Sequence, residues 1–237
     1  PPDPSSAPFC SIGGNIACNA GGPRAVKYGA TRDNILALKA VTGTGELVEF
    51  GSATNKNSSG FDLSRLLIGS EGGLALVVEA TLKLTPRPDA RQMLRALFRD
   101  VESAAHAVAR VMNQANTPSM LEFMDATSIR LAREIGGADI EDAGALILLE
   151  TDGEPHLLSS QLQGLANYLQ GDGCISIDIA SSDAEQAQLM AARKALSPAL
   201  RSLASGKINE DVVVPVSQVP TLVRFVEKLS AEQQLLI

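Results

Sequence analysis

The sequence predicts an α+β fold with an antiparallel sheet and helices on one face. In the later part of the chain, segments with apolar residues at helical spacing alternate with short apolar runs. In the earlier part, glycines are frequent and the short β-like runs are separated by turn residues. The pattern changes at 86–89, which predicts two domains, 1–88 and 89–237.

The first part is predicted to be mainly strand. The runs 34–42 and 47–50 predict two strands, and the glycines of the loop 43–46 supply the backbone freedom that a hairpin needs. The run 74–84 is mostly alternating and predicts a further strand pair or one long strand. The segment 64–68 predicts one or two helical turns.

The second part alternates predicted strands and helices. Asp125 and Asp183 are expected to cap the helices that follow them, and Pro155 to occupy the first turn of another. The predicted strands are 93–98, 120–124, 145–150, 175–179 and 212–214. The predicted helices are 101–114, 125–135, 154–170, 183–196 and 221–232.

Composition excludes several classes of function. The formal net charge is -7, the pI is near 4.9 and no basic run occurs, so nucleic acid is not an expected partner. No stretch reaches the roughly 20 apolar residues that cross a bilayer, so no transmembrane segment is predicted. With 45% hydrophobic residues, the chain has enough apolar surface for a substantial core.

Cysteines and histidines are few and scattered. Cys10, Cys18 and Cys174 form no CxxC pair, which favours reduced thiols in a cytoplasmic protein, with membrane association through a complex left open. His106 and His156 belong to no metal-ligand motif, so no metal site is predicted within this chain. No GxSxG motif supports a serine nucleophile.

Two glycine-rich segments are the main candidates for chemistry. In Ser11–Gly29 (SIGGNIACNAGGPRAVKYG), glycines let backbone N–H groups approach an anion closely, and asparagines add amide donors. Neither GxGxxG nor GKS/GKT occurs, so Rossmann and P-loop sites are excluded. The second segment is 69–73 (GSEGG), in which Glu71 could meet a ribose or adenine. Taken alone, the first segment is at least as consistent with a structural connector as with a ligand loop, and the second is better explained as a plain turn with a solvated carboxylate.

Together the two segments resemble the FAD-linked oxidase family of the vanillyl-alcohol oxidase type. Within it the chain is most similar to the branch of the glycolate oxidase flavoprotein subunit, D-lactate dehydrogenase (cytochrome) and D-2-hydroxyglutarate dehydrogenase. The resemblance is close over the first third, from IGGNIACNAGG to GSEGGLALVVEATLKL, and looser over the rest, notably in PSMLEFMD and KINEDVVVPVSQVP. It implies the second half of an FAD-binding domain followed by a ferredoxin-like cap domain with an antiparallel sheet.

The resemblance also implies binding residues. Cys18 stands where relatives often have a small hydroxyl residue, and a thiol is the weaker hydrogen-bond donor. A carboxylate substrate would meet Arg193, Ser197 and Lys207 of the cap domain; the alternative is that both cations are ordinary solvated side chains. The implied FAD contacts are Gly13, Gly14, Asn15, Cys18, Asn19, Gly22, Tyr28, Gly29, Glu71, Gly72 and Val77.

The implied activity is oxidation of a D-2-hydroxy acid (glycolate, D-lactate or D-2-hydroxyglutarate) to the 2-oxo acid, with hydride transfer to FAD. The reduced flavin would pass its electrons to a quinone, cytochrome or flavoprotein, or to sister subunits. Compared with the family, the chain is expected to be incomplete at both ends. The catalytic histidine and the ligands of a divalent metal would then lie outside it, and it is expected to retain FAD weakly or not at all and to be inactive alone.

Two alternatives remain open on the sequence. One is a non-catalytic homologous subunit of an oxidase complex, which the pattern of Asn15, Asn19 and Tyr28 disfavours. The other is a binding module formed by the second half, which would bind a 2-hydroxy acid when expressed as 90–237.

Overall fold

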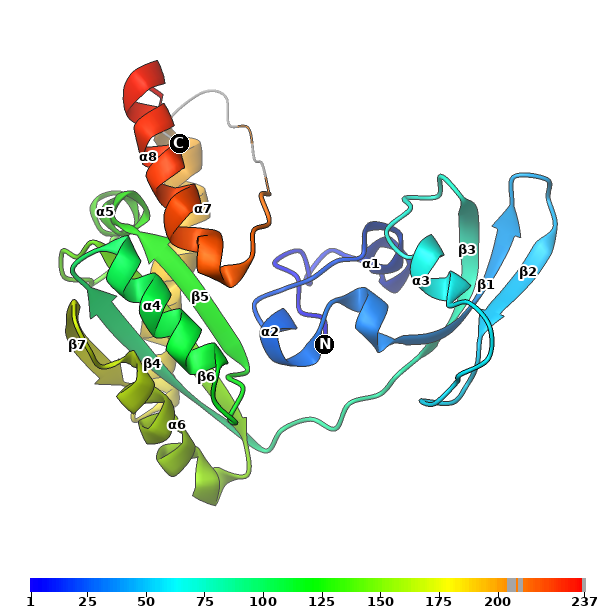
Figure 1. The fold of residues 1–237 in the computed structure, drawn as a ribbon, viewed down its shortest axis with the longest axis horizontal. Helices are drawn as coiled ribbons and strands as arrows, with labels where there is room; N and C mark the ends of the chain where they lie inside the picture. Colours follow the sequence, from blue (N-terminus) through cyan, green and yellow to red (C-terminus); the bar gives the residue numbers. More distant parts are fainter. Residues whose placement is uncertain (204–207, 209–210, 236–237) are drawn as a thin grey trace. The chain divides into compact units, whose positions relative to one another are not determined.

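The computed structural model describes residues 1–203, 208 and 211–235, and the chain forms two compact units (Figure 1). The N-terminal unit is Pro1–Arg87 and the C-terminal unit is Pro88–Ile237. No helix of the described residues is both long and apolar enough to span a membrane.

The N-terminal unit contains a three-stranded antiparallel sheet in the order β2-β1-β3. The predicted hairpin is confirmed as β1 (Ile35–Thr42) and β2 (Leu47–Gly51). Gly45, at φ +83°, makes its tight turn, in a backbone conformation that few other residues adopt without strain. The run 74–84 forms one strand, β3 (Ala75–Leu82), rather than a pair.

Short helices accompany this sheet. The glycine-rich segment 11–29 is more helical than a turn-rich connector would be, because it contains α1 (Ile12–Cys18) and α2 (Ala25–Tyr28). The Ser11 hydroxyl caps α1 by accepting the Gly14 N–H at 3.0 Å. The 3-10 helix η1 (Thr31–Asn34) precedes β1, and α3 (Leu63–Leu67) follows β2. The core consists of Ile16, Leu38, Ala40, Leu67, Ile68 and Ala75.

The C-terminal unit contains a four-stranded antiparallel sheet in the order β5-β6-β4-β7. With helices α4 and α6 as its two crossovers, this is the ferredoxin-like topology, and α5 is an added helix between β5 and β6. Its strands are β4 (Ala90–Phe98), β5 (Met120–Asp125), β6 (Ala145–Gly153) and β7 (Cys174–Ile179). The predicted α+β class with an antiparallel sheet is therefore confirmed.

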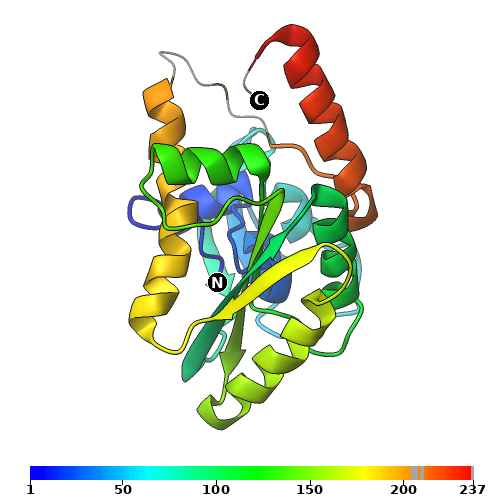
Figure 2. The same ribbon diagram turned by 90° about the vertical axis from the view of Figure 1, so that its left-hand side faces the viewer.

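Helices cover both faces of this sheet, so the prediction of helices on one face was wrong. The helices α4 (Val101–Met112) and α6 (Pro155–Leu169) pack on the face of Leu94, Phe98 and Leu149. The helices α5 (Ala126–Glu134) and α7 (Asp183–Leu203, orange in Figure 2) pack on the opposite face. The run 145–149 is apolar at every position, and a strand with such a run buries both of its faces.

Three further expectations need correction. Residues 212–214 are not a strand: Val212 and Val213 are exposed, and β5 and β7 form the edges of the sheet. β-branched residues favour extended structure, but a strand also needs a neighbour to pair with. The helix predicted to end at 196 continues to Leu203, and Ser182 rather than Asp183 caps it, since its hydroxyl accepts the Glu185 N–H.

The last helix is α8 (Val219–Gln233), and the short 3-10 helix η2 (Val216–Gln218) leads into it. Both lie against α4. Arg224 Nη1 of α8 pairs with Glu102 Oε2 of α4 at 3.4 Å, and both side chains are more than half exposed. This exposed ion pair adds little stability.

Candidate flavin-binding wall and substrate arginine

The two glycine-rich segments lie against each other in the N-terminal unit. The Gly69 N–H donates to the Ile16 carbonyl and the Glu71 N–H donates to the Ala17 carbonyl, both at 3.0 Å. The acceptors belong to the last turn of α1, whose carbonyl groups have no partners within the helix. The segment 69–73 therefore closes the C-terminal end of α1, and residues more than fifty positions apart form one surface.

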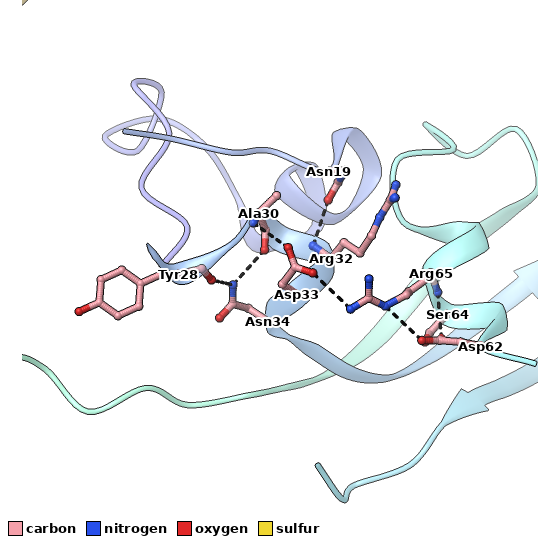
Figure 3. Close-up of polar contacts among 9 residues, drawn as sticks. All are labelled: Asn19, Tyr28, Ala30, Arg32, Asp33, Asn34, Asp62, Ser64 and Arg65. Atoms are coloured by element: carbon pink, nitrogen blue, oxygen red, sulfur yellow. Dashed lines mark hydrogen bonds and ion pairs between the residues drawn. The ribbon is translucent and has the colours of Figure 1, made fainter. Parts of the chain in front are cut away.

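Asn19 connects this surface to η1. It ends α1 in the left-handed conformation at φ 49°, which asparagine tolerates better than most residues. Its Oδ1 accepts the backbone N–H of Arg32 at 3.0 Å (Figure 3). Gly69 packs closely here, because a Cβ at that position would lie 3.0 Å from the Asn19 Cβ.

Two buried polar side chains hold the backbone between α1 and β1. Thr31 donates its hydroxyl and its N–H to the Ala20 carbonyl, at 2.8 and 3.0 Å. Asn34 Nδ2 donates to the carbonyls of Tyr28 and Ala30, at 3.0 and 2.9 Å. Buried amides and hydroxyls that are satisfied in this way fix a loop in one conformation.

An exposed ion-pair chain continues from η1 to α3 (Figure 3). Asp33 accepts the Ala30 N–H at 3.0 Å and pairs with Arg65 Nη2 at 3.2 Å. Arg65 Nε also pairs with Asp62 at 3.2 Å. The hydroxyl of Ser64 lowers the pKa of Asp62 more than any other group does, and the Arg65 N–H lowers it further. These contacts position α3 and include none of the predicted cofactor residues.

The predicted glycines fall into two groups. A Cβ at Gly22 would lie 2.4 Å from the Asp3 carbonyl oxygen, and one at Gly29, which has φ +73°, would lie 2.6 Å from the Asp33 side chain. Packing alone requires glycine at these two positions. A Cβ at Gly13 would meet nothing within 4 Å, so neither packing nor backbone conformation explains the glycine there. The space at Gly72 is equally open, but its φ of +81° itself favours glycine.

The remaining predicted cofactor residues differ in exposure. Gly14, Cys18 and Glu71 are exposed, whereas Val77 is partly buried against the core of the unit. Asn15 lines a cavity of about 310 Å³ together with Ile12, Asn34 and Lys83. The larger cavity of about 540 Å³, between β2 and α3, is lined by none of the predicted cofactor residues.

The C-terminal unit holds the predicted substrate arginine. Arg193 on α7 donates its Nε to Glu122 Oε2 of β5 at 2.5 Å, and the two side chains are 30% and 23% exposed. In the described residues its terminal nitrogens have no partner, so the guanidinium fork remains available to a second carboxylate. The side chain of Ser197 and the whole of Lys207 lie outside the described residues.

Within the described ranges, no group of three or more His, Cys, Asp or Glu residues is arranged to hold a metal ion. Thr31, Arg32 and Asn34 carry much of the polar structure of the wall and were not predicted from the sequence. The signal was present: the run TRDN lies between the glycine-rich segment and the first strand, and such residues favour side-chain to backbone hydrogen bonds.

Comparisons with known proteins agree with this architecture. Residues 87–237 match the family model described as FAD linked oxidases, C-terminal domain, and residues 1–51 match the FAD binding domain. The glycolate oxidase subunit GlcD of Bacillus subtilis (strain 168) is 33% identical over 238 residues, which is 100% of this chain and 51% of that protein. The D-2-hydroxyglutarate dehydrogenase of Xanthomonas citri pv. viticola is 37% identical over 247 residues, 97% of this chain and 48% of that protein.

A D-lactate dehydrogenase of Anaerostipes hadrus is 33% identical over 98% of this chain and 50% of that protein. Among solved structures, an alkyldihydroxyacetonephosphate synthase has a TM-score of 0.72 at 20% identity, covering 98% of this chain and 47% of that one, which shows a shared fold. The chain thus spans about half the length of the relatives it matches. It belongs to the family of FAD-linked oxidases.

Proposed function

We propose that this chain forms one wall of the FAD site, together with the substrate-facing cap, of a longer D-2-hydroxy-acid dehydrogenase. The observation that carries the proposal is the junction between α1 and 69–73, which joins the two segments on which the resemblance rests. The relatives named glycolate oxidase subunit, D-lactate dehydrogenase and D-2-hydroxyglutarate dehydrogenase support the substrate class. By itself the chain is expected to retain little FAD, because it supplies only part of the contacts.

The residues of the N-terminal unit fit a flat, polar cofactor. Gly13 and Gly72 leave open space at the backbone, and Asn15 within α1 and Asn19 at its end add partly buried amide groups. In this role, backbone atoms of α1 and of 69–73 would approach the cofactor closely, which side chains larger than hydrogen would prevent. When bound, FAD accepts a hydride from the substrate carbon.

The cap would bind and orient the acid. Arg193 presents its two terminal nitrogens to the substrate carboxylate, and Glu122 fixes the plane of the guanidinium through Nε. Because Glu122 already compensates the charge of Arg193, a bound carboxylate would need a further cation beside it, the role proposed for Lys207. A carboxylate held in this way fixes the orientation of the hydroxyl-bearing carbon next to it. A fixed orientation of the reacting carbon raises the reaction rate.

The sharpest test replaces Gly13 by alanine in the full-length flavoprotein. Alanine is the better helix former by up to about 1 kcal/mol, so Gly13→Ala in α1 should slightly raise thermal stability. It should also lower FAD affinity, because its methyl group occupies the space the cofactor needs. The matched control is Gly164→Ala in α6, where a Cβ likewise meets nothing within 4 Å. This control should raise stability and leave FAD affinity unchanged, as followed by flavin fluorescence titration.

Equal FAD affinity in the Gly13→Ala protein and in the parent would contradict the proposed wall. The substrate class is tested separately, by mixing the oxidised holoprotein with glycolate, D-lactate, D-2-hydroxyglutarate and D-malate and recording the flavin absorbance. Bleaching by at least one acid is expected. A flavin that stays oxidised with all four would instead favour a non-catalytic subunit.

A further inference from the structure

Arg32 is an unusual cation in the N-terminal unit. Its Nε is buried and has no hydrogen-bond partner, and it is the one buried side-chain N or O atom in this state within the part of the chain that the structure describes. Its backbone N–H is held by Asn19 Oδ1 at 3.0 Å, so the residue itself is firmly placed. Figure 3 shows the side chain turning away from Asp33 and Arg65.

This arrangement costs free energy unless another group completes it. A buried N–H group without an acceptor loses its hydration, about 1–3 kcal/mol and more for a charged group. Other arginines of the chain avoid this cost: Arg65, Arg95 and Arg193 each pair with a carboxylate. The carboxylate next to Arg32 in sequence, Asp33, is instead directed to the Ala30 N–H and to Arg65.

The guanidinium lies at the junction of the two glycine-rich segments. A Cβ at Gly69 would lie 3.8 Å from Arg32 Nη2, so the bare backbone of Gly69 lies directly beside this end of the guanidinium. Gly69 has φ +87°, a conformation that also disfavours other residues there. Two independent features, an unpaired buried donor and a bare backbone beside it, therefore occur at one place.

We propose that Arg32 binds a phosphate group of the FAD pyrophosphate, as a further cofactor-binding residue of the wall. The inference rests on the proposed function. A guanidinium matches phosphate oxygens with paired, charge-assisted hydrogen bonds through its terminal nitrogens, and a phosphate would compensate the charge of this otherwise unpaired group. The pyrophosphate is the part of FAD that carries negative charge, so it is the part a lone cation should select.

The test uses the full-length flavoprotein and the variant Arg32→Met, which keeps the apolar stem and removes the donors. Without cofactor, Arg32→Met should be at least as stable as the parent, because an unsatisfied buried donor is gone. With cofactor, the FAD dissociation constant should rise about 10- to 100-fold, as expected for the loss of hydrogen bonds to a charged group. The matched control is Arg65→Met, which removes a paired guanidinium nearby and should leave FAD affinity unchanged.

A second variant, Arg32→Lys, keeps the charge and the length but loses the planar fork. At saturating FAD, its bound pyrophosphate should have phosphorus NMR shifts different from those of the parent, whereas Arg65→Met should have the parental shifts. Parental FAD affinity in Arg32→Met would overturn the proposal, and so would unchanged phosphorus shifts in Arg32→Lys. Failure of the parent itself to bind FAD would instead contradict the proposed function.

Discussion

The two units of the chain bury their sheets very differently. In the C-terminal unit, helices cover both faces of the four-stranded sheet, and the central strand β6 is almost entirely buried. In the N-terminal unit only one face of the sheet has a core. On its other face, Leu47 and Leu76, which both pair with Val41, are 62% and 66% exposed.

This difference indicates where each unit obtains its stability. The C-terminal unit has the apolar burial that a self-sufficient domain needs. The N-terminal unit depends more on specific polar contacts, such as those of Asn34, Thr31 and Asn19, and it exposes apolar surface of the kind usually covered by another part of a protein. Substitutions in the two units should therefore have different effects, which hydrogen exchange can measure unit by unit.

The largest effect is expected from Leu149→Ala in β6. This side chain is fully buried between the sheet and the helices α4 and α6, so its truncation leaves a cavity and should cost about 2–5 kcal/mol. The equivalent change on the exposed face of the other sheet, Leu76→Ala, should cost far less. Amide exchange of the 237-residue chain should show loss of protection in the C-terminal unit alone for the first variant. Similar losses of stability for Leu149→Ala and Leu76→Ala would refute the proposed difference between the two units.

A smaller effect, about 1–3 kcal/mol, is expected from Asn34→Ala in the N-terminal unit. The change removes two donors at once and leaves the carbonyls of Tyr28 and Ala30 without this partner. Exchange should accelerate in 28–36 and leave the C-terminal unit unchanged. The exposed Asn113 is the matched control, and its replacement by alanine should have little effect on either unit. If the amides of the N-terminal unit exchange as slowly in Asn34→Ala as in the parent, apolar packing is sufficient to stabilise this unit.

The smallest effect is expected at a helix cap of the C-terminal unit. Asp100 accepts the Ser103 N–H at 2.7 Å, and Asp100→Ala should cost about 0.5–2 kcal/mol. The same hydrogen bond is the main reason why the pKa of Asp100 in the folded chain lies below its usual value of 3.8. Its charge therefore stabilises the fold fully above pH 3.8, and this contribution is lost as the pH falls through the lower, folded pKa.

The control for this cap is Asp100→Asn, which keeps a capping oxygen but carries no charge. The stability difference between the parent and Asp100→Asn, measured by urea unfolding, should be largest above about pH 4 to 5. It should shrink as the pH falls from the ordinary pKa through the lower pKa of the folded chain. A difference that is independent of pH would mean that the cap acts without its charge.

Much of the secondary structure could be predicted because it depends on local sequence. The spacing of apolar residues in 101–114 and the capping position of Asp125 predicted α4 and α5. The prediction for 212–214 was wrong, although its residues favour strands, because a strand also needs a hydrogen-bonded neighbour and this segment belongs to neither sheet. The segment 11–29 was expected to be dominated by turns, but Ser11 and Asn19 cap a helix within it in spite of its glycines.

By itself, the sequence determined the α+β class, the antiparallel arrangement and the resemblance to FAD-linked oxidases, since these depend on periodicity, turn residues and motif spacing. Only the tertiary structure decided that the end of α1 meets 69–73, that the buried Nε of Arg32 lacks an acceptor, and that Glu122 pairs with Arg193. The physical reason is that hydrogen bonding and burial depend on which distant residues become neighbours. The sequence specifies which hydrogen bonds a side chain can donate or accept, and only the fold specifies whether a hydrogen-bond partner lies beside it.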